Sequence, residues 1–410
     1  MTVPFDPIDR PSPSRAQILL LAAGLLLIGL NLRIGIASVG PVLTEIRADL
    51  GLSATAVSLL TTIPVVAFGA FAFLAPRLIR GFGLHRLLGA AMIAIAAGIA
   101  VRLIPDLTAL YAGTVLLGAA IAIANVVMPA VIKHDFSRHV GIMMGLYSTT
   151  LFIGAAIASG LTVPLLSAVN GNWRGALALW AVPALVAFVV WLPQLRRSEG
   201  RVARSSAAAD ARARVPFSRV LKDPIAIGVT AWMGIQSIGY YATLTWVPTV
   251  FQDAGIDART AGWLLSFSAL PGVVGSLVAP IIARRVRPPW VLVIIAVVLI
   301  GAGFLGLAIS PVEGAYVWMT LLGLGQGAGI SLALSYIVWR SPDAQHTGQL
   351  STMAQGFGYL IAGLGPIGIG AIHAATGEWR VPLGVLIGLL VLQAIAGVVA
   401  SQERHILQRD

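Results

Sequence analysis

The sequence predicts an all-α membrane protein in which twelve transmembrane helices form two six-helix halves, related by a pseudo-twofold axis along the membrane normal. Three observations predict this fold: a shortage of charge, a series of long apolar runs and an internal repeat. Of the 410 residues, 58% are hydrophobic and only 10% are charged, and the mean hydropathy is +0.90. Soluble globular chains keep roughly a quarter of their residues charged. Most of the surface of this chain must therefore face lipid.

Apolar runs long enough to cross a bilayer follow one another along the chain. An α-helix needs about 20 residues to span ~30 Å of hydrocarbon. The sequence holds twelve candidate runs, near 17–40, 54–76, 86–104, 107–131, 140–167, 174–193, 224–248, 259–282, 289–309, 314–339, 346–372 and 381–400. No small-residue cleavage site follows the first run, so we expect it to be a retained span and not a signal peptide.

The formal net charge of +11 is explained by membrane topology. If the N-terminus faces inward, the outward-facing segments hold only four of the 27 Lys and Arg residues, which are Arg47, Arg174, Arg259 and Arg380. Because Lys and Arg accumulate in cytoplasmic segments, we expect a multi-pass protein of the bacterial inner membrane with both termini in the cytoplasm. The basic segments would then face anionic lipid, and no nucleic-acid partner is required.

A basic polar segment divides the chain into two halves. The stretch 194–222 carries eight cationic and two acidic residues and is the longest polar stretch in the sequence. Six apolar runs precede it and six follow. We therefore predict an N-terminal six-helix half (1–193), a cytoplasmic linker (194–222) that is mobile or lies on the membrane surface, and a C-terminal six-helix half (223–410).

The two halves repeat each other. Residues 171–174 (Gly-Asn-Trp-Arg) recur as 377–380 (Gly-Glu-Trp-Arg), and residues 51–54 (Gly-Leu-Ser-Ala) recur as 255–258 (Gly-Ile-Asp-Ala), after nearly the same number of residues. Ser53 and Asp257 would each be the N-cap of a span. Since six is an even number of spans, both copies share one orientation. This arrangement predicts a binding site between the halves near the midplane, with one half rocking on the other.

Arg33 is the most informative polar residue, because it lies deep inside the first apolar run. A cation inside a span costs at least ~2.5–3.5 kcal/mol. No run contains Asp or Glu, so a mobile anion is the natural partner, and the planar guanidinium fork suits a carboxylate or similar anion. The alternative is that Arg33 snorkels outward or binds backbone carbonyls. Arg102, near the end of the third run, is expected to snorkel to water past Pro105.

Other polar residues inside the runs are candidates to line the same cavity. The predicted substrate-binding set consists of Arg33, Asn125, Tyr147, Gln236, Tyr240, Gln326, Gln355 and Tyr359. Aligning the seventh run on the first by their prolines, Pro248 and Pro41, places Tyr240 opposite Arg33. Singly, each such residue is more often a helix–helix hydrogen bonder than a ligand. Asn31 is about 200° from Arg33 around a helix and should bind a neighbouring helix unless the helix is distorted there.

Several functional classes are disfavoured by what the runs lack. The chain has no cysteine, and its six histidines show no metal-binding spacing, so we expect no metal site. The runs hold no acid–base pair or activated nucleophile, which argues against an enzyme. A twofold repeat without a selectivity ring argues against a channel.

Three stretches resemble the cyanate and 2-nitroimidazole transporter group (CynX/NimT-like) of the major facilitator superfamily. They are 31–33 (Asn-Leu-Arg) with Pro41, 125–136 (Asn-Val-Val-Met-Pro-Ala-Val-Ile-Lys-His-Asp-Phe), and 356–366 with 377–379. The resemblance implies twelve helices, no organic cofactor and a small polar or anionic solute. One departure is Arg80, which stands where the superfamily's loop between spans 2 and 3 usually carries Asp.

Together, these observations predict a secondary active or facilitative transporter, expected to be a monomer, that moves a small anionic or compact polar solute by alternating access. Arg33 would bind the solute. The alternative is a multidrug or toxic-compound efflux pump of the same fold, although the fifth run lacks the Gly-Pro motif of many drug–proton antiporters.

Overall fold

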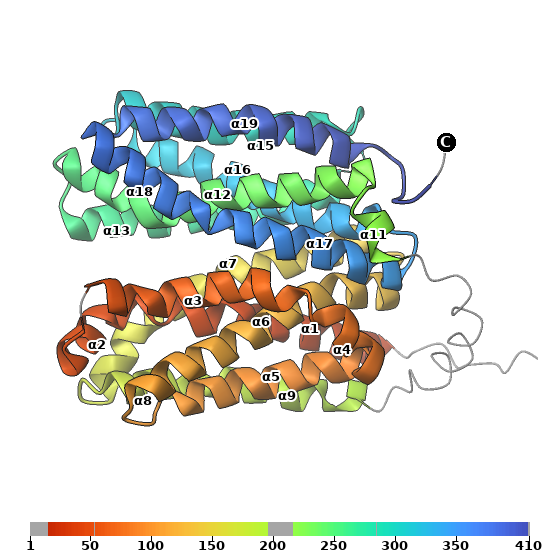
Figure 1. Cartoon of the computed structure of the whole chain (residues 1–410), viewed down its shortest axis with the longest axis horizontal. Coiled ribbons are helices and arrows are strands. Elements are labelled where there is room, and N and C mark those ends of the chain that lie inside the picture. Colours follow the sequence, from red (N-terminus) through yellow and green to blue (C-terminus); the bar gives the residue numbers. More distant parts are fainter. Residues whose placement is uncertain (1–14, 53, 196–215, 284, 409–410) are drawn as a thin grey trace, which may run out of the picture.

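A computed structural model describes residues 15–52, 54–195, 216–283 and 285–408. Within these ranges every regular element is a helix. Figure 1 shows two helical bundles side by side, with α1 to α9 in one and α12 to α19 in the other. The predicted all-α fold of two bundles is confirmed.

The N-terminal bundle is formed by long helices and a few short ones that connect them. Its elements are α1 (Arg15–Ala37), η1 (Gly40–Val42), α2 (Leu43–Leu50), α3 (Ala54–Ala72), α4 (Ala75–Phe82), α5 (Leu84–Val101), α6 (Leu107–Asp135), α7 (Val140–Ala168), α8 (Trp173–Leu179) and α9 (Ala181–Leu195).

The C-terminal bundle has the same plan. Its elements are α11 (Phe217–Val220), α12 (Pro224–Asp253), α13 (Ala258–Phe267), α14 (Ala269–Ile282), α15 (Val291–Ile309), α16 (Ala315–Trp339), α17 (Ala344–Ala362), α18 (Leu364–Thr376) and α19 (Arg380–Ser401). Several helices begin at an Asp or Asn whose side chain accepts a backbone N–H of the first turn, which is the usual N-cap arrangement.

The helices account for the predicted spans in three ways. In the described ranges, ten helices or continuous helix pairs are long and apolar enough to cross a membrane, and the pair α3 and α4, bent by 63°, makes an eleventh span. The remaining predicted span is α12, which is 30 residues long. Polar residues of α12, among them Gln236, Tyr240 and Tyr241, lower its hydropathy, as expected of a helix that faces a cavity.

Large apolar side chains cover the outside of both bundles. Ile309 and Ile367 are each 69% exposed, and Val391 is 62% exposed. Exposed apolar surface of this extent is typical of a face that contacts lipid. At the predicted linker, α9 ends at Leu195 and α11 begins at Phe217, and residues 196–215 lie outside the described ranges.

The internal repeat is reproduced in three dimensions. The indole Nε1 of Trp173 donates to Asp49 Oδ2 (3.0 Å), and in the other half that of Trp379 donates to Asp253 Oδ2 (2.7 Å). Gly171 and Gly377 precede these tryptophans with φ of +78° and +70°, a conformation that favours glycine. The prediction that Asp257 is an N-cap is confirmed by its bonds to the N–H groups of the next turn, whereas Ser53 lies outside the described residues.

The two halves meet along α7 and α14 and along α17, which packs on α3 and α6. Glycines allow the close approach: a Cβ added to Gly145 would lie 3.0 Å from the carbonyl oxygen of Leu277, and one added to Gly356 would lie 2.7 Å from the Phe73 ring. These contacts extend from the middle of the molecule toward the end where α4, α11 and the C-terminus lie (Figure 1). We call this the linker end, and the opposite end, with α2, α8 and α13, the far end.

Candidate functional site

A cavity lies between the two halves, and Arg33 is one of the residues that line it. Its lining residues come from α1, α7, α12, α16 and α17: Arg33, Leu151, Phe152, Gln236, Ser237, Tyr240, Tyr241, Ile330 and Tyr359. About 20 Å³ is open to the centre of a water molecule, and one water needs roughly 10–15 Å³ by this measure. In this conformation the cavity suits a solute of only a few atoms. We call it the central cavity.

Arg33 enters the central cavity from α1 because the rest of that helix is packed away. Ile28 and Leu32 are fully buried in the N-terminal half, and Asn31 Nδ2 donates to the carbonyl oxygens of Leu27 and Pro183. The expectation that Asn31 binds a neighbouring helix is thus confirmed, since Pro183 belongs to α9. Among the described residues no carboxylate forms an ion pair with Arg33, and no Asp or Glu lines the cavity.

Aromatic rings surround the guanidinium. The Arg33 Cζ lies 5.7 Å from the centroid of Phe68, within cation–π range. From Phe68 a chain of ring contacts runs across both halves: to Tyr359 (5.3 Å), to Tyr241 (6.5 Å), to Tyr240 (5.4 Å) and to Phe152 (6.2 Å). We call these five rings the aromatic collar. The collar presents flat apolar faces and three phenol groups around one cation.

Three of the predicted site residues form a hydrogen-bonded group beside the cavity. Tyr147 OH donates to Asn125 Oδ1 (3.1 Å), and Gln355 Nε2 donates to the Asn125 carbonyl oxygen (2.8 Å) and to Ser351 Oγ (2.8 Å). The group joins α6 and α7 of one half to α17 of the other. Asn125 Nδ2 and Gln355 Oε1 remain buried without a partner among the described residues. These residues bridge the two halves, but they do not line the central cavity.

Gln326 lies away from the central cavity. Its Nε2 donates to Thr243 Oγ1 (2.8 Å), and the residue lines a separate chamber inside the C-terminal half. Of the predicted set, therefore, four residues line the central cavity: Arg33, Gln236, Tyr240 and Tyr359. Sequence reasoning left Phe68, Phe152, Ser237 and Tyr241 out of the set. Only Tyr241, next to Tyr240, carried a signal, because phenylalanine in an apolar run does not stand out.

Arg102 corrects one expectation. Instead of snorkelling to water it is only 2% exposed, and its guanidinium donates to Thr114 Oγ1 (3.1 Å) and to the Gly35 carbonyl oxygen (3.4 Å). It ties the end of α5 to α6 and α1. Its role in the structure is to hold helices together, and the small residues around it give it room inside the bundle.

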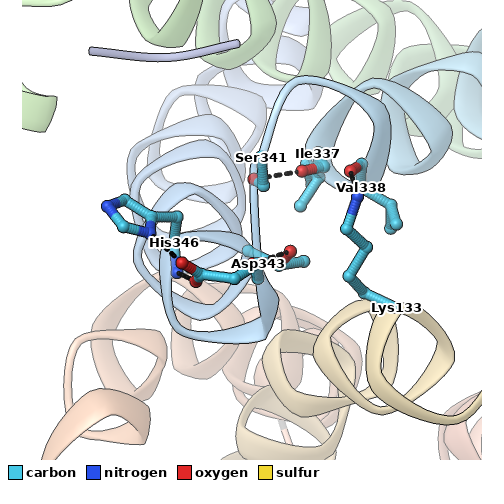
Figure 2. A network of polar contacts seen from close by, with 7 residues as sticks. Lys133, Ile337, Val338, Ser341, Asp343 and His346 are labelled. Atoms are coloured by element: carbon cyan, nitrogen blue, oxygen red, sulfur yellow. Dashed lines mark hydrogen bonds and ion pairs between the residues drawn. The ribbon is translucent and has the colours of Figure 1, made fainter. Parts of the chain in front are cut away.

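A polar network joins the halves at the linker end. Lys133 Nζ, at the end of α6, donates to the Val338 carbonyl oxygen of α16 (3.3 Å), and Asp343 caps α17 by accepting from His346 N (2.9 Å) and His346 Nδ1 (2.8 Å). Figure 2 shows Lys133 reaching from one half toward the Val338 turn, with Asp343 and His346 beside it. The hydrogen bonds from His346 hold the pKa of Asp343 below its usual value. In the described part of the chain no cluster of three or more His, Asp or Glu residues could hold a metal ion.

Two repeated helical bundles with an apolar exterior and a cavity between them that holds a few polar groups are typical of a membrane transporter. The chain belongs to the Major Facilitator Superfamily, whose profile it matches over residues 21–366 and 238–405. It is 36% identical to the uncharacterized transporter YycB of Bacillus subtilis over 98% of both chains. It is 36% identical to the 2-nitroimidazole transporter of Escherichia coli, covering 95% of this chain and 97% of that protein.

Further comparisons agree in family and in fold. The cyanate transport protein CynX of Escherichia coli is 32% identical over 90% of this chain and 94% of its own length. Among solved structures, the proton:xylose symporter XylE bound to 6-bromo-6-deoxy-D-glucose matches with a TM-score of 0.71 at 16% identity, covering 92% of this chain and 94% of that one. FucP in the outward conformation matches with a TM-score of 0.66 at 13% identity, covering 93% and 99%. These structures share the fold.

Proposed function

We propose that the protein moves a small, planar anion or a compact polar heterocycle across the bacterial inner membrane by alternating access, and that Arg33 binds this solute. The observation that carries the proposal is a guanidinium on the cavity between the halves with no carboxylate partner among the described residues. A cation inside the membrane without a counter-charge is costly. A solute that brings negative charge or acceptor oxygens to Arg33 offsets that cost.

The aromatic collar narrows the chemistry of the solute. A flat, delocalised group can place its oxygens on the guanidinium fork and its face against the tyrosine rings. A carboxylate or a nitro-heterocycle meets both demands, and the linear cyanate ion meets the first through its terminal oxygen or nitrogen. The names of two relatives, a 2-nitroimidazole transporter and a cyanate transport protein, support this solute class.

A ligand screen and matched Arg33 variants test the proposal. In a thermal-shift screen of purified protein against small carboxylates, cyanate, 2-nitroimidazole and sugars, we expect a planar anion or nitro-heterocycle to raise the Tm, because a ligand stabilises the state that it binds. Arg33→Ala should abolish that shift and reduce uptake to background at normal expression. Arg33→Lys, which keeps the charge but loses the planar fork, should weaken both.

Two results would count against the proposal. Wild-type uptake by an Arg33→Ala protein present at normal levels would remove Arg33 from solute binding. Export of lipophilic cations, which Arg33 should repel, would instead favour the alternative of a multidrug efflux pump. In either case the assignment as a twelve-helix transporter would remain, and a different class of solute would have to be considered.

A further inference from the structure

The C-terminal half contains a second, smaller chamber that the proposed function does not use. It lies among α12, α15, α16 and α19, and its apolar walls include Ile300, Phe304 and Leu390. Three glutamine side chains also line it: Gln236, Gln326 and Gln393. All three are at least nine-tenths buried, and Gln393 is only 1% exposed. Three amides on the wall of an otherwise apolar chamber require partners, because a buried polar group without one costs roughly 1–3 kcal/mol.

The hydrogen bonds that these amides already make show which of their atoms still lack a partner. Gln236 Nε2 donates to Ser237 Oγ (2.7 Å) and Gln326 Nε2 donates to Thr243 Oγ1 (2.8 Å). No described residue donates a hydrogen bond to either carbonyl oxygen, Oε1, and neither atom is among the fully enclosed unpaired atoms, so both border open space. Gln393 makes no side-chain hydrogen bond to any described residue, and its Nε2 is fully enclosed. The amide torsion of glutamine is soft, so Gln393 can turn either end toward the chamber. With the Nε2 of Gln393 turned inward, the three amides present one donor and two acceptors to the chamber.

We propose that this chamber holds one ordered water molecule, which accepts a hydrogen bond from Gln393 Nε2 and donates one each to the Oε1 atoms of Gln236 and Gln326. About 10 Å³ of the chamber is open to the centre of a water molecule, which matches the space that a single buried water needs. Three polar partners also match the usual number for such a water. The chamber is otherwise too small for a solute.

The water site gives α19 a connection to the central cavity. Gln236 lines both the chamber and the central cavity, so this residue lies between them. The water would fix the orientation of this amide from behind. Gln393 is therefore a positioning residue, on a helix that contributes no residue to the lining of the central cavity.

Radiolytic hydroxyl-radical footprinting of the intact, detergent-solubilised protein tests for the water directly, because radicals form where water is held. Phe304 lines the chamber and Phe251 does not, although both are fully buried in the same half. We expect oxidation of Phe304 and protection of Phe251. Equal protection of both rings would show that the chamber is dry, and equal oxidation would show that the signal is not specific to it. Either result overturns the proposal, and neither depends on the identity of the solute.

The near-isosteric variant Gln393→Met provides the matched test of the hydrogen bonds. It keeps the side-chain length but removes the donor. We expect Phe304 oxidation to fall to the level of Phe251 while the Tm is maintained. Undiminished oxidation of Phe304 in a folded Gln393→Met protein would contradict the assigned role of Gln393. The measurement on the native chain stands even if this variant does not fold.

Discussion

The two arginines inside predicted spans differ in what their surroundings do with a cation. Arg33 faces the central cavity and an aromatic ring, whereas Arg102 is enclosed and bound to a hydroxyl and a backbone carbonyl. The position of each arginine within its apolar run could not separate these two cases. A residue that faces the cavity and a residue enclosed within a bundle have the same kind of apolar neighbours along the chain. The difference arises from which face of each helix packs, and it leads to opposite expectations for mutation.

Replacing Arg102 should affect folding and spare transport. Arg102→Ala removes charge-assisted hydrogen bonds worth about 1.5–3 kcal/mol each between α5, α6 and α1. We expect a lower Tm and a lower yield, with wild-type uptake per folded molecule. Arg138→Ala, at an exposed position, is the control and should change neither. An unchanged Tm, or loss of uptake at normal yield, would refute the structural role of Arg102.

At the scale of the elements, the sequence predicted most of the helices because hydropathy and length are local properties. Apolar runs and the repeated Gly and Trp residues mark where helices begin and end. The sequence alone could not predict the 63° bend between α3 and α4, because that bend depends on how these two helices pack against their neighbours. It also could not show that Asn125, Tyr147 and Gln355 bond one another while Gln326 faces a different chamber. Side-chain direction across a bundle is set by tertiary packing.

The start of α17 gives a prediction at this scale. Asp343 is its N-cap, and Asn caps helices about as well as Asp does. Asp343→Ala should lower stability by about 0.5–2 kcal/mol, whereas Asp343→Asn should cost less. Because hydrogen bonds from His346 depress the pKa of Asp343 below 3.8, the folded state binds fewer protons than the unfolded state in this range. The stabilisation is therefore complete above pH 3.8 and is lost as the pH falls through the depressed value.

Thermal unfolding measured from pH 7 into the acid range checks this expectation. The gap in stability between wild type and Asp343→Ala should be widest near neutral pH and should narrow below pH 3.8. A gap that widens on acidification would have the wrong sign. Equal losses for Asp343→Ala and Asp343→Asn at pH 7 would show that the charge matters and the cap does not.

For the whole molecule, the close contacts between halves extend from the middle toward the linker end, and the central cavity lies beside them. Two hydrogen bonds between the halves belong to these contacts: Thr149 Oγ1 and Ser276 Oγ lie 3.1 Å apart across α7 and α14, and Lys133 donates to the Val338 carbonyl oxygen. We call these contacts the seal. Lys133 is also attracted to Asp343 on the opposite half. Under the proposed alternating access, such contacts belong to a state that is closed at the linker end. Their loss should favour the state that opens there, because a conformational equilibrium responds to interactions made in only one state.

Lys133→Met therefore should increase opening at the linker end. Losing a hydrogen bond from a charged donor costs roughly 1.5–3 kcal/mol, and 1.4 kcal/mol is a tenfold change in an equilibrium. The chain has no cysteine, so Ser276→Cys, fully buried at the seal, is a single-thiol reporter without further engineering. The sequence predicts that the linker end faces the cytoplasm, which is the side that inside-out vesicles expose. We therefore expect a membrane-impermeant thiol reagent to label it about tenfold faster in inside-out vesicles carrying Lys133→Met.

The second lysine of the chain, Lys222, supplies the control. It is exposed near the linker end, and Lys222→Met removes the same charge without touching the seal, so labelling of Ser276→Cys should stay at the wild-type rate. If lowering the basic charge had a general effect, labelling would become faster by the same factor in the Lys133→Met and Lys222→Met proteins. Unchanged labelling in the Lys133 variant would mean that packing of α7 on α14 holds the halves together, since the glycines there already bring the two backbones into contact.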